Sequence, residues 1–68
     1  MLKAVNMKNY RFGKLQNIQY VGFGILDTEN NSFVSYDGFK PYVLDRKNII
    51  QSVIDAEWPK DMKRVEMR

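Results

Sequence analysis

The clearest pattern in the chain is a run of β-forming residues from Ile18 to Leu26, rich in Ile, Val, Tyr and Phe. A polar loop follows it, and a second β-rich run covers residues 32–36. Two such runs around an Asn-containing loop are typical of a β-hairpin. The pattern predicts a central hairpin over residues 18–36, with Asp27 paired to Ser32 across a polar turn.

A different periodicity marks the second half of the chain. Four apolar residues recur at the three-to-four spacing of one helical face: Ile49, Ile50, Val53 and Ile54. Asp45 is a suitable N-cap, and Pro59 pushes the residue before it out of helical geometry. The pattern predicts one amphipathic helix over residues 46–57, with Trp58 continuing its apolar face as a core anchor.

The two ends of the chain carry shorter alternating patterns. Val5 and Met7 alternate with polar neighbours, as do Val65 and Met67, which indicates a short strand at each end. Together the elements predict an α+β fold, with a small curved antiparallel sheet of three to five strands and one helix across it. The whole chain, residues 1–68, is expected to form a single small domain.

The predicted hairpin has two different faces. Five residues share the face that the helix would cover: Val21, Phe23, Ile25, Val34 and Tyr36. The opposite face sets two glycines among larger side chains: Tyr20, Gly22, Gly24, Leu26, Phe33 and Ser35. The glycines leave a shallow slot that is either a docking groove and dimer face, or is filled by Phe39, Tyr42 or the N-terminal arm. The second interpretation is slightly favoured, because strand glycines often serve packing within one chain.

The hairpin also carries a resemblance to a known family. Gly-Phe-Gly-Ile at residues 22–25 and Phe-Val-Ser-Tyr at residues 33–36 resemble the paired strand motifs of cold-shock domains. In that family, aromatic residues on a small β-barrel stack on single-stranded bases. The resemblance implies nucleic-acid binding by sheet aromatics, although the register above turns Phe23 and Phe33 to opposite faces. Val21 stands where the family has a basic residue.

The amino-acid composition limits the kinds of reaction and metal site that the chain can provide. The chain has 68 residues and contains neither Cys nor His, which excludes disulfides, thiolate and imidazole metal sites and Cys-His or Ser-His-Asp nucleophile systems. The acidic residues fall mostly beside predicted turns, and so short a chain has little scaffold to enclose a reaction site. We expect no enzyme activity, no cofactor and no metal. A chain of this size is also marginal by itself, which predicts self-association as a twofold dimer.

Charge is unevenly distributed. The net charge is +3, but residues 1–14 and 60–68 are basic, while residues 15–45 are acidic. If the two basic terminal segments lie side by side, they form one surface that would attract an acidic protein, a nucleic-acid backbone or a membrane surface. The alternative is a solvated surface that keeps a small protein in solution.

Basic and aromatic residues interleave near the N-terminus, as they do in protein interfaces and nucleic-acid sites. With the glycine face they give the candidate interaction surface: Tyr10, Arg11, Phe12, Lys14, Tyr20, Gly22, Gly24 and Phe33. The leading hypothesis is a small non-enzymatic protein, bacterial or phage-encoded, that regulates or inhibits a larger macromolecule by protein–protein interaction. The alternative is a module that binds single-stranded nucleic acid. No run has the length of a membrane span, and we expect a cytoplasmic protein with no membrane partner.

Overall fold

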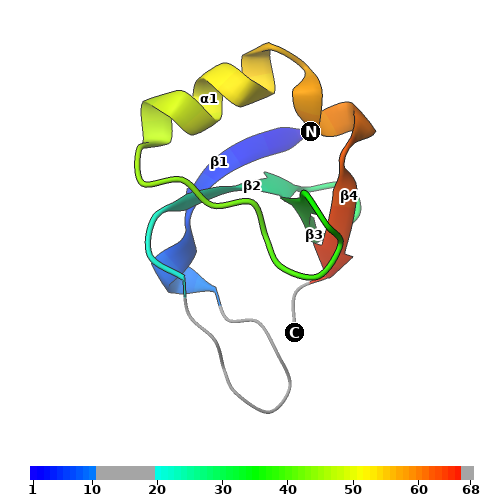
Figure 1. Ribbon diagram of the computed structural model, residues 1–68, viewed down its shortest axis with the longest axis horizontal. Coiled ribbons are helices and arrows are strands. Elements are labelled where there is room, and N and C mark those ends of the chain that lie inside the picture. Colours follow the sequence, from blue (N-terminus) through cyan, green and yellow to red (C-terminus); the bar gives the residue numbers. More distant parts are fainter. Residues whose placement is uncertain (11–19, 67–68) are drawn as a thin grey trace.

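The computed structural model of the protein describes residues 1–10 and 20–66. One antiparallel sheet has the order β1-β2-β3-β4 and is not closed into a barrel (Figure 1). Its strands are β1 (Leu2–Asn6), β2 (Phe23–Asp27), β3 (Ser32–Ser35) and β4 (Lys63–Glu66). With one α-helix beside the sheet, the predicted α+β class is confirmed, whereas the four strands described do not close into the barrel of cold-shock domains.

The predicted pairing of the central hairpin is confirmed. Leu26 faces Phe33 and Asp27 faces Ser32, with residues 28–31 as the turn. The strands are shorter than the apolar runs, because Gly22 has a φ of 127° and β2 begins only after it. Val21 is consequently 94% exposed and Tyr36, beyond the end of β3, is 80% exposed. The prediction that both lie in the core is wrong.

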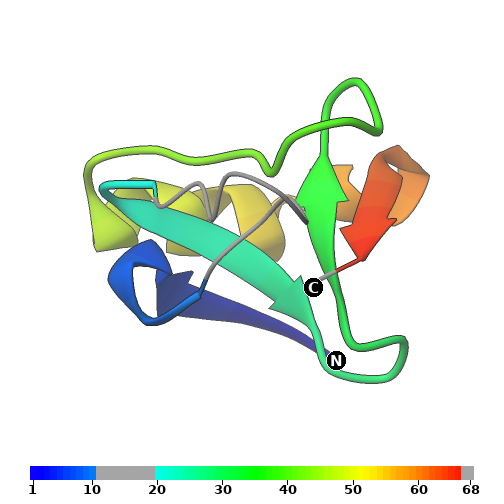
Figure 2. The same cartoon turned by 90° about the horizontal axis from the view of Figure 1, so that it is seen from below.

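β2 and β3 diverge from their shared turn (Figure 2). Residues 41–44 lie between the separated ends and join both strands through backbone hydrogen bonds. The Phe23 N–H donates to the Leu44 carbonyl at 2.6 Å, and the Leu44 N–H donates back at 2.9 Å. The Tyr42 N–H donates to the Val34 carbonyl at 2.9 Å. This connecting segment therefore acts as an additional short strand at the open end of the hairpin.

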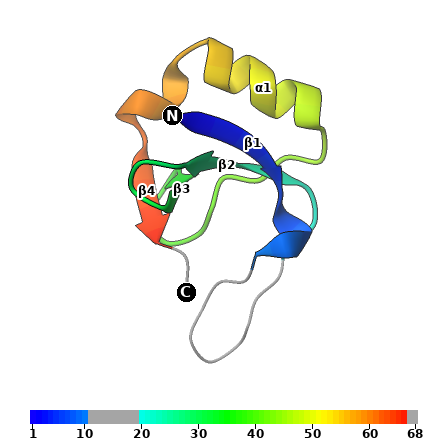
Figure 3. The ribbon, with the colours of Figure 1, turned by 180° about the vertical axis from the view of Figure 1, so that it is seen from behind.

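One face of the sheet is covered by α1 (Lys47–Asp55), which runs along β1 (Figures 1 and 3). The main core lies between them and contains Ile25, Val34, Ile50 and Val53. Ile50 and Val53 are buried, as the helical stripe predicts, whereas Ile49 is 43% exposed. Burial of this stripe holds a helix that would be marginal in isolation, because it has only nine residues.

Both ends of α1 differ from the prediction. The N-cap is Arg46 rather than Asp45, and no side chain caps this end. The helix ends at Asp55, before the predicted residue 57, because Glu57 takes a left-handed conformation with φ of 63°. The chain then enters the 3-10 helix η2 (Trp58–Asp61) in a new direction. Trp58 is therefore 63% exposed, and its prediction as a core anchor is wrong.

A second cluster covers the other face of the sheet. Met7, at the start of the 3-10 helix η1 (Met7–Asn9), packs with Phe33, and both are completely buried. Smaller contributions come from partly buried neighbours: Val5, Tyr10, Tyr20, Leu26, Val43 and Val65. The sheet is thus packed on both faces.

Candidate binding surface

The structure places the predicted surface residues in different environments. Phe33 is completely buried, and the Tyr10 ring packs edge-on against it at a centroid distance of 5.0 Å. Phe23 belongs to the core on the opposite face, beside α1. The two aromatics of the cold-shock-like motifs therefore do not share an open face. Arg11, Phe12 and Lys14 lie outside the described residues.

The glycine slot is filled from within the chain. A Cβ atom built on Gly24 would lie 2.6 Å from the Met7 Sδ, and one on Gly22 would lie 2.5 Å from the Leu44 carbonyl oxygen. The two positions admit only glycine without movement of their neighbours. Intramolecular filling was the favoured interpretation, and it is supported for Tyr42, whose carbonyl lies beside Gly24. Met7 and residues 43–44 fill the remainder, whereas Phe39 is 87% exposed and takes no part. The space beside the two glycines is therefore occupied, whereas Tyr20 and Gly22 also line an open hollow of about 390 Å³.

The two basic ends of the chain do not pair as strands. β1 and β4 occupy opposite edges of the sheet, separated by β2 and β3. Lys3 lies on one edge strand and Lys63 on the other. The sheet order thus gives no support to a single basic surface made of both terminal segments.

A different surface emerges around an aromatic pocket, defined by Tyr36, Tyr42, Trp58 and Met62. The hollow has a volume of about 220 Å³. Tyr36 and Tyr42 stand almost perpendicular, with centroids 6.0 Å apart and an interplanar angle of 83°. Tyr36 and Trp58 are the exposed members, whereas Tyr42 and Met62 are partly buried and also contact the main core. The pocket therefore joins exposed aromatic side chains to a partly buried hydrophobic base.

Tyr36 belongs to a turn, residues 36–40, that is held by its own polar groups. The Asp37 carboxylate accepts hydrogen bonds from the N–H groups of Phe39 (2.9 Å) and Lys40 (3.2 Å), which lower its pKa. The buried Ser35 hydroxyl donates to the Lys40 carbonyl at 2.5 Å and accepts from the Gly38 N–H at 2.8 Å. These bonds fix the backbone and leave the Tyr36 and Phe39 side chains outside.

The opposite wall of the pocket is positioned by Arg64. Its Nη1 donates to the carbonyls of Pro59 and Met62, both at 2.8 Å, and so holds the segment that carries Trp58. Its Nε donates to the Asp27 carboxylate at 3.1 Å. This bond lowers the pKa of Asp27 more than any other contact does. The ion pair thus links the β2–β3 turn to the pocket wall.

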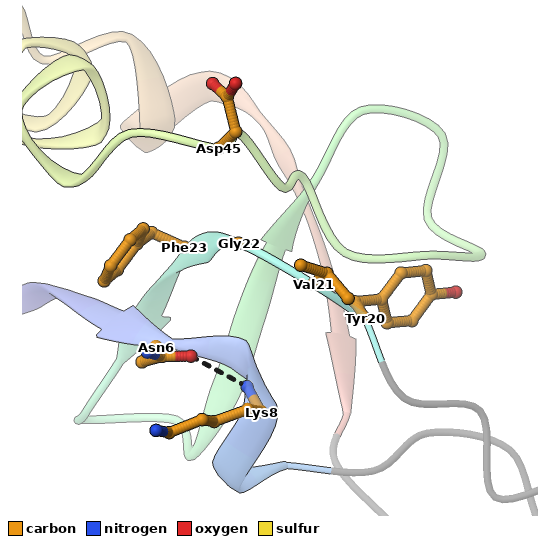
Figure 4. A pocket seen from close by; sticks show the side chains of 7 residues that line it. All are labelled: Asn6, Lys8, Tyr20, Val21, Gly22, Phe23 and Asp45. Carbon is orange, nitrogen blue, oxygen red and sulfur yellow. Dashed lines mark hydrogen bonds between the residues drawn. The ribbon is translucent and has the colours of Figure 1, made fainter.

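A second hollow, of about 390 Å³, lies where β1 ends and β2 begins (Figure 4). Its lining is mixed in character: Asn6, Lys8, Tyr20, Val21, Gly22, Phe23 and Asp45. The Asn6 side chain accepts the Lys8 backbone N–H at 3.0 Å and is engaged in capping η1. In Figure 4 the Asp45 carboxylate points away from Lys8, so the two charges do not converge on one point.

Sequence reasoning missed the aromatic pocket. The signals were present in the Asp37-Gly38 turn and in Pro59, which place Tyr36 and Trp58 just outside a strand and a helix. Within residues 1–10 and 20–66, no three His, Cys, Asp or Glu side chains gather as metal ligands. In the same ranges, no helix is both long and apolar enough to cross a membrane.

The chain was compared with known proteins at the level of family, sequence and structure. No protein-family model, curated protein or solved structure matches it.

Proposed function

We propose that the protein is a non-enzymatic protein-binding module that regulates a larger partner protein, and that it docks through the aromatic pocket. The observation that carries the proposal is the exposure of Trp58 and Tyr36 beside a hollow in so small a domain. Trp and Tyr are enriched among the residues that dominate binding energy at protein interfaces. Exposed clusters of this kind on small proteins frequently mark interaction sites.

The surroundings of the pocket support the same proposal. The hydrogen bonds of Ser35 and Asp37 hold one wall, and those of Arg64 hold the other. A surface that is ordered before binding loses less conformational entropy when the partner docks. The pocket is therefore suited to specific recognition rather than to general adhesion.

The test is capture of partners from a lysate of the encoding organism, with and without nuclease, by the wild-type chain and three variants. Tyr36→Ala and Trp58→Ala remove pocket walls. Val21→Ala is the control, because Val21 is an even more exposed hydrophobic residue that lines the other hollow. We expect the wild-type chain to capture protein bands that persist after nuclease treatment, and we expect the Val21→Ala variant to capture the same bands. Each pocket variant should weaken the isolated complex by about 1–2 kcal/mol, or roughly 5- to 30-fold.

Two results would contradict the proposal. Loss of all captured material after nuclease treatment would favour the nucleic-acid alternative. Captured proteins bound equally well by both pocket variants would place the function on another surface. Circular dichroism of each variant establishes that it is folded before its binding is compared.

A further inference from the structure

The lining of the aromatic pocket limits what it can bind, and the following inference rests on the proposed function. The volume of about 220 Å³ is below the ~300–1,000 Å³ typical of sites for small molecules. The described residues that line the pocket are all uncharged, and all except Met62 are aromatic. The hollow is therefore suited to one compact apolar group that projects from a partner protein.

The charged residues on the segments that carry the pocket walls do not favour an ion of either sign. Arg64 is paired with the Asp27 carboxylate at 3.1 Å. The remaining charged residues of segments 36–42 and 57–64 are acids and lysines in equal number: Asp37, Glu57, Asp61, Lys40, Lys60 and Lys63. All of them are exposed to solvent. Because the two signs balance, electrostatic attraction selects neither a cationic nor an anionic side chain.

The aromatic side chains also carry hydrogen-bond donors. Tyrosine has a hydroxyl group and tryptophan has an indole N–H. Within residues 1–10 and 20–66, neither the hydroxyls of Tyr36 and Tyr42 nor the indole N–H of Trp58 bonds to another residue. These donors remain available to a partner. The matching ligand combines an apolar group with carbonyl oxygens that are not already hydrogen-bonded.

The backbone conformation of the partner decides whether its carbonyl oxygens are free. In an α-helix they accept N–H groups of the same helix, and in a sheet they pair with neighbouring strands. A polyproline II segment has no internal hydrogen bonds, so its carbonyl oxygens remain free. Proline supplies a compact apolar ring and fixes the backbone before binding, which reduces the entropy lost on docking. Grooves lined by aromatic residues are a recurring site for such segments.

From these features we infer that the aromatic pocket accepts a proline ring from a partner segment in the polyproline II conformation. The ring packs against the aromatic walls and Met62. Neighbouring carbonyl oxygens of the segment accept hydrogen bonds from the tyrosine hydroxyls and the indole N–H. A leucine presented by a helix would fill the hollow without satisfying these donors. A lysine or arginine would bring a charge that none of the described lining residues neutralises.

The test uses the intact protein and synthetic peptides of about 18 residues, a length at which a helix can form. The first is an acetylated oligoproline amide. The second, of glycine and serine, has free carbonyl oxygens but no proline ring. The third is an amphipathic helix of leucine, glutamate and lysine, whose carbonyl oxygens are bonded internally.

Trp58 is the single tryptophan of the chain, so its fluorescence reports on the pocket. We expect a saturable response to the oligoproline, with at least fivefold weaker binding of the other two peptides. Because no charge contributes, raising the NaCl concentration from about 50 to 500 mM should change the affinity less than twofold.

Variants separate hydrogen bonding from ring packing. Tyr36→Phe and Tyr42→Phe each keep the ring, remove only the hydroxyl and retain the fluorescent reporter. Each should weaken binding of the oligoproline at least threefold. Tyr10→Phe is the matched control, because Tyr10 belongs to the cluster on the other face of the sheet. It should leave the binding unchanged.

The outcomes distinguish this inference from the proposed function. Equal or tighter binding of the helical peptide, unchanged affinity of both pocket Tyr→Phe variants, or no saturable response to the oligoproline overturns the proline inference. The protein-binding function would still stand in those cases if Trp58→Ala abolished capture of the partner. Intact capture by Trp58→Ala would instead remove the proposed function, whatever the peptides show.

Discussion

Arg64 and Asp27 show how one side-chain pair couples distant parts of a small chain. Asp27 also accepts hydrogen bonds from the Glu29 N–H at 3.1 Å and from the Asn30 side chain at 3.1 Å, which shape the β2–β3 turn. The pair is largely screened from solvent, unlike the contact between the Met1 amino group and Glu29, whose members are almost fully exposed. Burial makes the first pair important for stability and the second nearly neutral.

We predict that Arg64→Met destabilises the fold by about 2 kcal/mol at pH 7, because it leaves the charged Asp27 without its strongest partner. The folded-state pKa of Asp27 lies below its ordinary value. Its contribution to stability is therefore complete above about pH 4 and is lost as the pH falls through the lowered pKa. The difference between Arg64→Met and wild type should shrink at about pH 2–3, as measured by urea denaturation.

Glu29→Gln supplies the control for this experiment. It removes an exposed ion pair, and such pairs contribute about 0–1 kcal/mol. Its stability should follow that of the wild type at both pH values. An Arg64→Met protein that loses as much stability as the wild type on acidification would show that the Asp27 pair is not the source of the pH dependence.

Gly22 and Gly24 show how far the position of single residues in a sequence can predict packing. Their spacing correctly indicated a narrow place on the hairpin, but spacing alone could not say what enters it. Met7 was assigned only to an alternating terminal strand, and nothing in its neighbours marked it as the side chain that fills the slot. Its placement depends on how the end of β1 turns into η1, which is a property of the folded chain.

At the scale of elements, local sequence patterns were enough to predict a helix or strand pair when one of its faces is buried against a single neighbouring element. The α1 stripe and the pairing of Asp27 with Ser32 were both recoverable for this reason. The insertion of residues 41–44 between β2 and β3 was not, because it depends on the divergence of two strands. The aromatic pocket was missed for the same reason, since Tyr36, Tyr42 and Trp58 meet only once this segment is in place.

The helix prediction can be checked with matched substitutions on its two sides. Ile50→Asp or Val53→Asp should abolish the cooperative thermal transition, because burying an unpaired charge costs several kcal/mol in a marginally stable domain. Ile49→Asp should remain folded, because that side chain is 43% exposed. Circular dichroism on heating gives the answer, and cooperative melting of all three variants at the wild-type temperature would contradict this placement of α1.

At the scale of the whole molecule, packing on both faces alters the expectation for self-association. The sequence predicted a dimer because a chain of this size is marginally stable by itself and because the hairpin offered a second apolar face. Met7 and residues 42–44 fill the space beside the two glycines of that face. Because residues of the same chain cover that part of the sheet, the burial of apolar area no longer favours association of a second copy there.

We accordingly expect a monomer in solution. Static light scattering over a dilution series at micromolar concentrations should give the mass of one chain, 8.1 kDa, throughout. A mass near twice that value, falling on dilution, would restore the predicted dimer. In that case Tyr36→Ala would show whether the copies meet at the aromatic pocket.

The turn at residues 36–40 separates the atoms that hold the backbone from the side chains that meet the solvent. Ser35 and Asp37 supply the side-chain hydrogen bonds of the turn, whereas the side chains of Tyr36 and Phe39 lie mostly in the solvent. Side chains at these two positions can therefore change over generations without disturbing the framework beneath them. If a partner alters its docking residue, a single substitution on this turn can follow it, so that recognition evolves while the fold stays constant.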